Sequence, residues 1–101
     1  MPRKTEAGRR SYDLWYLYKM TADEYNARLE AQGGICALCS TSANTDGRRL
    51  YVDHDHACCS GRRSCGKCIR GIVCAVCNIA LSKQDKDPEW ALRLHNYQIG
   101  H

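Results

Sequence analysis

Two short cysteine pairs, Cys36-Ala-Leu-Cys39 and Cys74-Ala-Val-Cys77, constrain the fold of this chain more than any other feature of its sequence. The spacing of two residues lets both thiolates of a pair reach one tetrahedral metal ion. A zinc ion bound by both pairs would hold together the two ends of the 34-residue insertion between them. The sequence therefore predicts a structural zinc site that closes an inserted hairpin.

The insertion between these pairs contains four further cysteines. They are Cys58, Cys59, Cys65 and Cys68. Cys65 and Cys68 form a third CxxC unit, whereas the side chains of adjacent residues such as Cys58 and Cys59 diverge. We therefore expect a second zinc ion in this loop, bound by the four cysteines, with His56 or water as the alternative fourth ligand.

Eight cysteines in 101 residues could also form four disulfides, as in proteins of oxidising compartments. However, the chain has no run of about 18 apolar residues, and its first ten residues, MPRKTEAGRR, lead into no apolar stretch of signal-peptide type. We therefore expect a cytoplasmic protein with no membrane association, whose cysteines bind metal. A chain of this length forms one domain with a small core, so metal must help to stabilise it.

Positive charge is concentrated in two segments of the chain. Residues 1–11 carry a net charge of +3 and residues 48–70 a net charge of +4, while the whole chain has a formal net charge of +4. Basic segments of this kind are candidate contacts for a polyanion such as nucleic acid. Because residues 1–11 lack apolar periodicity, we expect a flexible basic arm at 1–11 and a single folded domain at 12–101.

Two helices are expected before the first cysteine pair. The first has four apolar residues that can share one face and pack in the core. They are Leu14, Trp15, Leu17 and Tyr18. Thr21 and Glu24 have the spacing of a capping box, which predicts that a second helix spans about 22–32. Gly33 and Gly34 should end that helix, because glycine readily adopts the left-handed conformation of a C-cap.

Two strands with a metal-binding loop between them are expected in the middle of the chain. Residues 49–53 alternate between apolar and polar, and residues 69–73 are a second strand candidate. The intervening loop has no periodicity, so its shape must come from ligands. If Cys65 and Cys68 shared a metal ion with the pair at 74–77, the two strands could not pair, so we favour the first arrangement.

Two more helices are expected after the strands. The run NIALSKQ, which starts at Asn78, predicts one helix, and Pro88 stands at the favoured first position of another that extends through Tyr97. The sequence therefore predicts a small zinc-stabilised α+β domain in which a hairpin and a helix carry flanking N-terminal and C-terminal helices.

Asp53-His54-Asp55-His56 follows the first strand directly. On an extended chain the two aspartates point to one face and the two histidines to the other. A carboxylate oxygen suits a hard cation such as Mg²⁺, and an imidazole can act as a base near neutral pH. Asn78, expected in the first helical turn beside the second cysteine pair, offers an amide oxygen that can also bind Mg²⁺. We interpret these side chains as candidate catalytic residues.

The segments CALC at 36–39, YVDHDH at 51–56 and IRGIVCAVCN at 69–78 together resemble the phage recombination endonuclease VII family, a branch of the HNH or His-Me finger nucleases. The similarity extends from about Thr21 to Tyr97. It implies a ββα-metal unit, a hairpin followed by a helix, that is braced by one zinc ion. The implied zinc ligands are Cys36, Cys39, Cys74 and Cys77.

The same resemblance implies a role for each polar residue near the hairpin. Asp53 and Asn78 would hold a catalytic Mg²⁺ or Mn²⁺, His54 would be the general base, and His56 would orient the metal site or the phosphate. The implied activity is DNA endonuclease cleavage, as nicks or double-strand breaks, with 5′-phosphate and 3′-hydroxyl products and low sequence specificity. Basic residues that we expect to contact the DNA backbone are Arg48, Arg49, Arg62, Arg63, Lys67 and Arg70. Of these, Arg70 is expected nearest to the scissile bond.

The alternative from another class is a noncatalytic zinc module that binds nucleic acid or protein, which would not need an acid, a base and an amide together. Junction resolvases of the family form intertwined dimers with more chain after the catalytic unit. Only about 23 residues follow Asn78 here, so we expect a monomer or weak homodimer. If the protein is phage-encoded, phage recombination or packaging proteins are candidate partners and the bacterial host cytoplasm is the expected location.

Overall fold

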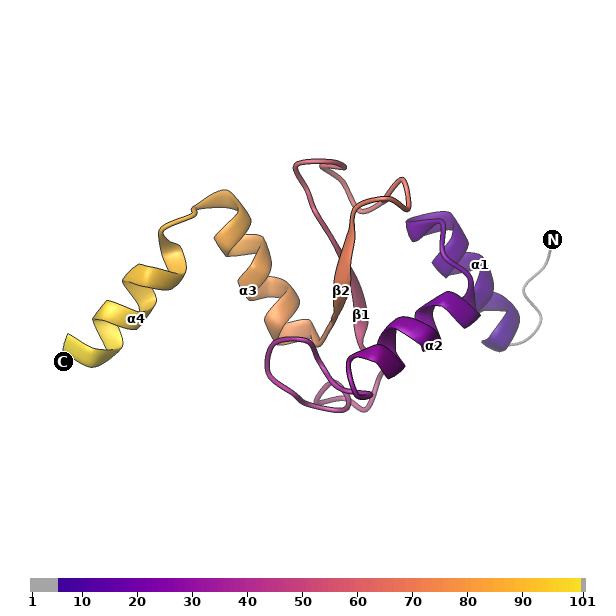
Figure 1. Ribbon diagram of the computed structural model, residues 1–101, viewed down its shortest axis with the longest axis horizontal. Coiled ribbons are helices and arrows are strands. Elements are labelled where there is room, and N and C mark those ends of the chain that lie inside the picture. The colour runs from indigo at the N-terminus through magenta and orange to yellow at the C-terminus, as the bar shows by residue number, and fades with distance from the viewer. Residues whose placement is uncertain (1–5, 101) are drawn as a thin grey trace.

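A computed structural model describes residues 6–100 of the chain (Figure 1). Its elements, in chain order, are α1 (Glu6–Tyr18), α2 (Ala22–Ala31), β1 (Tyr51–His54), β2 (Ile69–Val73), α3 (Ala75–Lys86) and α4 (Trp90–Gly100). Within the described residues, the two strands form one sheet and the four helices flank it. The small α+β architecture predicted from the sequence is therefore confirmed.

The two strands pair as an antiparallel hairpin in the centre of the molecule. Val52 lies opposite Ile72 and Asp53 opposite Gly71, but the register shifts between Asp53 and His54, so that His54 lies opposite Ile69. Such a bulge breaks the strict alternation of side chains and turns the strand end locally. As a result, Asp53 and His54 are both buried, at 4% exposure each, although they are adjacent.

Helix α2 begins and ends as its sequence predicts. The Thr21 hydroxyl accepts the backbone N–H of Glu24, whose carboxylate in turn accepts the N–H of Thr21. After Gln32, Gly33 and Gly34 adopt φ angles of +78° and +77°, a conformation that favours glycine. The helix boundary is therefore set by local chemistry that can be identified in the sequence.

The side chain of Gln32 fastens the end of α2 to the sheet. Its amide nitrogen donates to the carbonyl of Ile72 at 2.9 Å, and its amide oxygen accepts the N–H of Ile72 at 2.8 Å. Ile72 is fully buried at the centre of the core, at 0% exposure. The core residues come from the N-terminal half of the chain and from the hairpin and the residue that follows it. They are Leu14, Met20, Tyr25, Cys36, Leu50, Val52, Ile72, Val73 and Cys74.

Helix α1 differs from the prediction in two ways. It begins at Glu6, so the second half of the segment expected to be a flexible arm is helical, while residues 1–5 lie outside the described part. Of the four apolar residues predicted to face the core, Leu14 is buried, whereas Trp15 is 54% exposed and lies beneath Lys19. A short helix that packs against a small domain buries only a narrow stripe of its surface. Some of its apolar side chains therefore stay exposed.

The two C-terminal helices also start elsewhere than predicted. Helix α3 begins at Ala75, three residues before the predicted start at Asn78, with Cys74 as its N-cap. The N–H of Asn78 donates to the carbonyl of Cys74 and closes the first turn. Helix α4 begins at Trp90, after a turn that contains Pro88. It leads away from the hairpin at one end of the molecule (Figure 1), and none of its residues is buried. Within residues 6–100, no helix combines the length and the apolar character that crossing a bilayer requires.

Candidate active site and cysteine clusters

The first cysteine cluster lies where the loop after α2 meets the start of α3. Its sulfur atoms all lie within 4.8 Å of one another, and Sγ of Cys39 and Sγ of Cys74 are 3.6 Å apart. Four ligands at about 2.3 Å around a tetrahedral zinc would place their sulfurs about 3.8 Å apart. The four cysteines of this cluster are Cys36, Cys39, Cys74 and Cys77. They therefore fit a zinc ion.

The backbone around Cys36 favours a thiolate at this position. Burial alone would raise the pKa of the Cys36 thiol. Hydrogen bonds from the backbone N–H groups of Cys39, Cys74 and Leu38 outweigh this effect and lower the pKa to about 6. The N–H groups of Cys74 and Leu38 lie 3.3 and 3.4 Å from Sγ of Cys36. A thiolate is the form of cysteine that binds metal, so this environment supports the structural zinc site.

The second cluster lies in the loop between the strands. Its four sulfurs also lie within 4.8 Å of one another, with 3.8 Å between Sγ of Cys58 and Sγ of Cys65 and 4.0 Å between Cys58 and Cys59. The members are Cys58, Cys59, Cys65 and Cys68. The adjacent Cys58 and Cys59 thus both reach one centre, and the four cysteines could hold a zinc ion without His56 or water. Both sets of cysteines predicted to bind zinc are therefore brought together.

A polar hollow of about 260 Å³ lies between the end of β1, the following loop and α3. Its lining contains all four predicted catalytic residues, together with Arg62 and three residues that the sequence analysis did not assign to the site. The lining residues are Tyr18, Val52, Asp53, His54, His56, Arg62, Asn78 and Ser82. Asp53 and Asn78 thus lie in one site although they are 25 positions apart in the chain. They are brought together by the hairpin bulge, the loop and the first turns of α3.

The imidazole of His54 is buried and held in one orientation. Its Nε2 atom lies 3.0 Å from two backbone carbonyl oxygens, those of Cys59 and Gly61. Carbonyl oxygens only accept hydrogen bonds, so Nε2 must carry the proton and the neutral ring has its lone pair on Nδ1. The ring of His56 lies 4.4 Å from that of His54. The two histidines therefore share one side of the strand end, as the alternation of side chains on an extended chain predicted.

The carboxylate of Asp53 is paired with Arg70. Nε and Nη2 of Arg70 donate to the two Asp53 oxygens at 2.7 and 3.0 Å. The same guanidinium donates to both oxygens of Asp85 on α3, at 3.0 and 2.9 Å. Arg70 lowers the pKa of Asp85, and the Asp85 and Asp53 carboxylates raise that of Arg70. Arg70 thus bridges two acids and does not present a free guanidinium, as a phosphate contact would.

Asp85 extends this network to the second histidine. Nδ1 of His56 lies 3.4 Å from the Asp85 carboxylate, so one acid contacts both Arg70 and His56. The sequence analysis missed Asp85 and Ser82. Their signal was helical spacing, because residues four and seven positions after Asn78 lie on the same face of a helix. With α3 placed by its N-cap, that face could have been identified.

The other predicted phosphate contacts lie in different places. Arg62 lines the hollow, while Arg63 stacks on Tyr16 of α1, with Cζ 4.3 Å from the ring centroid. Lys67 is exposed in the second cysteine loop. Arg48 and Arg49 lie on another face, where they line a larger cleft together with Tyr18. Of the six basic residues, Arg62 therefore lines the hollow, and the other five flank it or lie farther away.

The sequence of this chain matches the model of the recombination endonuclease VII family over residues 11–99. The chain therefore belongs to this family, as its sequence motifs predicted. The Gene 59 protein of Mycobacterium phage D29 is 44% identical over 61 residues, which cover 60% of this chain and 32% of that protein.

A second phage protein shows the same extent of similarity. The Gene 59 protein of Mycobacterium phage L5 is 43% identical over 61 residues, again 60% of this chain and 32% of the relative. The matched region thus spans about a third of the length of both relatives. No solved structure matches this chain.

Proposed function

We propose that the chain is a metal-dependent DNA endonuclease of the HNH or His-Me finger type that hydrolyses phosphodiester bonds with low sequence specificity. The observation that carries this proposal is the buried His54, whose Nε2 is committed to two carbonyls beside Asp53 and Asn78 in one hollow. A histidine that only filled the core would not need to line a polar hollow together with an acid and an amide.

In this proposal His54 is the general base. With the proton on Nε2, Nδ1 is free to take a proton from the attacking water as the new bond to phosphorus forms. The two carbonyls then stabilise the imidazolium that results, because Nε2–H remains their donor. A positioned base of this kind contributes roughly 10²- to 10⁴-fold to the rate.

Asp53 and Asn78 are the proposed ligands of a catalytic Mg²⁺ or Mn²⁺. Both line the same hollow, and oxygen donors of these types suit hard cations. A carboxylate has about four lone-pair sites, so the two hydrogen bonds from Arg70 leave Asp53 capacity to bind a cation. When bound, the ion would polarise the phosphate and neutralise charge on the departing 3′ oxygen. The expected products carry 5′-phosphate and 3′-hydroxyl ends.

His56 and Arg70 are proposed as positioning residues. His56 contacts Asp85, and its ring lies 4.4 Å from that of His54, so it would orient the base or the bound phosphate. Arg70 fixes the Asp53 carboxylate through two hydrogen bonds, which would hold that ligand in place when a cation binds. Arg62, which lines the hollow without an ion pair among residues 6–100, is the better candidate for contact with the scissile phosphate.

The two cysteine clusters are proposed as structural zinc sites. Four thiolates around one zinc leave no open position for water, so neither cluster would activate the nucleophile. The first would join the loop after α2 to α3, and the second would shape the loop that contacts His54. The origin of the relatives supports a phage protein that acts on DNA in the cytoplasm of its bacterial host, where recombination or packaging proteins are candidate partners.

The test is nicking of supercoiled plasmid by zinc-loaded protein with and without added Mg²⁺ or Mn²⁺. We expect nicks only with the divalent ion, and at least a 100-fold lower rate for His54→Ala with unchanged zinc content. His95→Ala is the matched control, because His95 lies on α4, outside the hollow. Binding of DNA without any cleavage would instead support the noncatalytic zinc module.

A further inference from the structure

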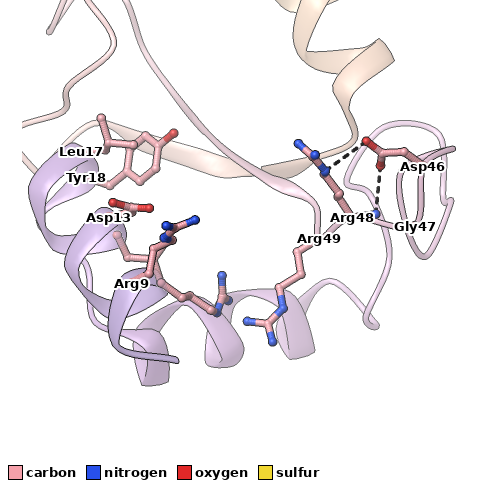
Figure 2. Close-up of a pocket in the computed structure, with 10 residues that line it drawn as sticks. Arg9, Asp13, Leu17, Tyr18, Asp46, Gly47, Arg48 and Arg49 are labelled. Carbon is pink, nitrogen blue, oxygen red and sulfur yellow. Dashed lines mark hydrogen bonds and ion pairs between the residues drawn. The ribbon is translucent and has the colours of Figure 1, made fainter. Parts of the chain in front are cut away.

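A second cleft is larger than the catalytic hollow and separate from it. It has a volume of about 690 Å³ and lies between helix α1 and the turn that precedes β1 (Figure 2). One wall contains Arg9 and Arg10 of α1, and the facing wall contains Arg48 and Arg49. Four guanidinium groups thus converge on one space from two segments that are about 40 positions apart in the chain.

The carboxylates in this cleft do not balance the arginines. The Asp46 carboxylate accepts the backbone N–H of Arg48 at 2.9 Å and lies 3.5 Å from the Arg48 side chain. Asp46 therefore stabilises the turn that contains Arg48. Asp13 is the other acid of the lining, and it has an interaction partner of its own. Arg49 forms no ion pair within residues 6–100. Two acids against four arginines leave a net positive cleft, which concentrates the potential in the space between its walls.

Arg10 is fixed in this cleft by the core. Its Cζ lies 4.3 Å from the ring centroid of Tyr25, and the Tyr25 hydroxyl donates to the carbonyl of Leu50 at 2.6 Å. Burial, followed by the charge of Arg49, lowers the pKa of Arg10, so the two guanidinium groups repel each other. An arrangement that holds like charges together costs free energy in the free protein, and a bound anion between them would recover it.

The facing wall is equally well defined. The buried Asn44 donates to the carbonyl of Arg49 at 2.8 Å, and its side-chain oxygen accepts the N–H of Ala75 at the start of α3 at 2.6 Å. The turn with Arg48 and Arg49 is thereby tied to the cysteine-braced part of the fold. Both walls of the cleft are therefore organised before any ligand binds, which lowers the entropic cost of binding.

Tyr18 joins this cleft to the catalytic hollow. It is part of the lining of both, and its ring lies 6.5 Å from the ring of His54. A chain of phosphates that places one member in the hollow would therefore pass Tyr18 and bring a neighbouring phosphate into the arginine cleft. Such a ligand is the backbone of a nucleic acid and not a single nucleotide.

We propose that the cleft of Arg9, Arg10, Arg48 and Arg49 is a second DNA-binding site that holds backbone phosphates beyond the scissile bond. This proposal rests on the proposed nuclease function, which identifies the ligand as DNA. Contacts in the cleft would increase the affinity for DNA and fix its position on the protein. They would not recognise its sequence, because guanidinium contacts to phosphate do not distinguish bases. Its arginines bind the substrate and its transition state equally, so they lower KM and leave kcat unchanged.

The test is the salt dependence of DNA binding. Zinc-loaded wild type and Arg9→Gln/Arg49→Gln are titrated against a fluorescent 20-base-pair duplex in Ca²⁺ at 50 to 200 mM salt. Loss of two phosphate contacts should make the slope of log Kd against log salt shallower by about 1.8. Over this fourfold salt range, the Kd of wild type should therefore rise about 12-fold more than that of the variant.

Two further variants separate this effect from a general loss of charge or fold. Arg28→Gln/Arg93→Gln removes the same charge from α2 and α4, outside the cleft, and should keep the wild-type slope. Arg9→Lys/Arg49→Lys keeps the charge and should also keep the slope. If Arg9→Gln/Arg49→Gln has the slope of the Arg28/Arg93 control, or if wild type does not bind the duplex, the cleft is not a DNA-binding site.

A parallel cleavage assay distinguishes failure of this proposal from failure of the nuclease function. With Mg²⁺ in place of Ca²⁺, the cleft variant should show at least a threefold higher KM and an unchanged kcat. Cleavage with identical KM for all variants would leave the nuclease function intact and overturn the cleft. Absence of cleavage, combined with a slope that depends on Arg9 and Arg49, would overturn the nuclease function and leave a DNA-binding cleft.

Discussion

The Nε2 atom of His54 lies 3.0 Å from the carbonyl oxygen of Cys59, so the backbone of a cysteine in the second cluster holds the ring of the proposed base. The carbonyl of Gly61, two residues farther along the same loop, makes the matching contact at 3.0 Å. Both acceptors lie in a loop that has no regular secondary structure of its own. Its shape, and with it the tautomer of His54, therefore depends on what the cysteines bind.

Removing the imidazole of His54 should remove activity and leave the fold. We expect His54→Ala to lower the nicking rate about 10²- to 10⁴-fold, with zinc content and DNA affinity close to wild type. His56→Ala should have a smaller effect, because His56 is more exposed and contacts Asp85 and not the loop carbonyls. Nicking rates of both variants at saturating Mg²⁺ measure the difference. If His54→Ala kept more than a tenth of the activity, His56 would become the candidate base.

Breaking the second cluster should affect catalysis through the loop. In Cys65→Ser we expect one zinc ion per chain in place of two, a folded core and at least a tenfold lower nicking rate. The reason is that the loop would no longer fix the carbonyls of Cys59 and Gly61 against His54. Elemental analysis and nicking assays on the same preparation make the measurement. Full activity with one zinc ion would show that the loop holds its shape without metal.

Breaking the first cluster should instead unfold the chain. Cys74 is buried, caps α3 and belongs to the core, and a structural zinc in a small domain contributes roughly 10–16 kcal/mol to folding. We therefore expect Cys74→Ser to lose cooperative thermal unfolding as followed by circular dichroism. Cys65→Ser serves as the control, since it removes one thiol of the exposed cluster. Similar unfolding curves for the two variants would contradict the division of roles between the clusters.

The parts of this structure that could be predicted from sequence are those set by local chemistry. The CxxC spacing indicated both clusters, and Thr21, Glu24 and the glycines at 33 and 34 marked the limits of α2. In each case the residues that decide the structure lie within a few positions of one another. Likewise, the four candidate catalytic residues chosen from the sequence all line one hollow. They are Asp53, His54, His56 and Asn78.

What sequence reasoning missed depends on long-range geometry. The bulge after Asp53 follows from how the two strands pair, and it leaves the adjacent Asp53 and His54 both buried. The pairing of Arg70 with Asp85 was not predicted, because Asp85 lies 15 positions away on another element. None of these contacts has a local pattern that would indicate it.

The pairing of Arg70 with two carboxylates should contribute to stability. Asp53 is 4% exposed, so Arg70→Gln would leave a buried carboxylate with fewer charged hydrogen bonds. Hydrogen bonds to charged groups contribute about 1.5–3 kcal/mol, and because the Arg70 side chain is 33% exposed we expect a loss of about 1–2 kcal/mol. Urea unfolding measures this loss. Arg62→Gln, which lines the same hollow, should unfold within about 0.5 kcal/mol of wild type.

Asp53→Ala should have a different defect from His54→Ala. Asp53 is proposed as a ligand of the catalytic cation, so its removal should weaken cation binding and leave the base in place. We therefore expect nicking by Asp53→Ala to recover at least tenfold when Mn²⁺ is raised from about 0.1 to 10 mM, because Mn²⁺ binds to mixed oxygen and nitrogen sites more tightly than Mg²⁺ does. His54→Ala should not recover, since no cation replaces a missing proton acceptor. Nicking rate against Mn²⁺ concentration, measured for both variants beside wild type, separates the two roles. If the two variants responded equally to Mn²⁺, Asp53 would not be a metal ligand, and its contact with Arg70 would be its main role.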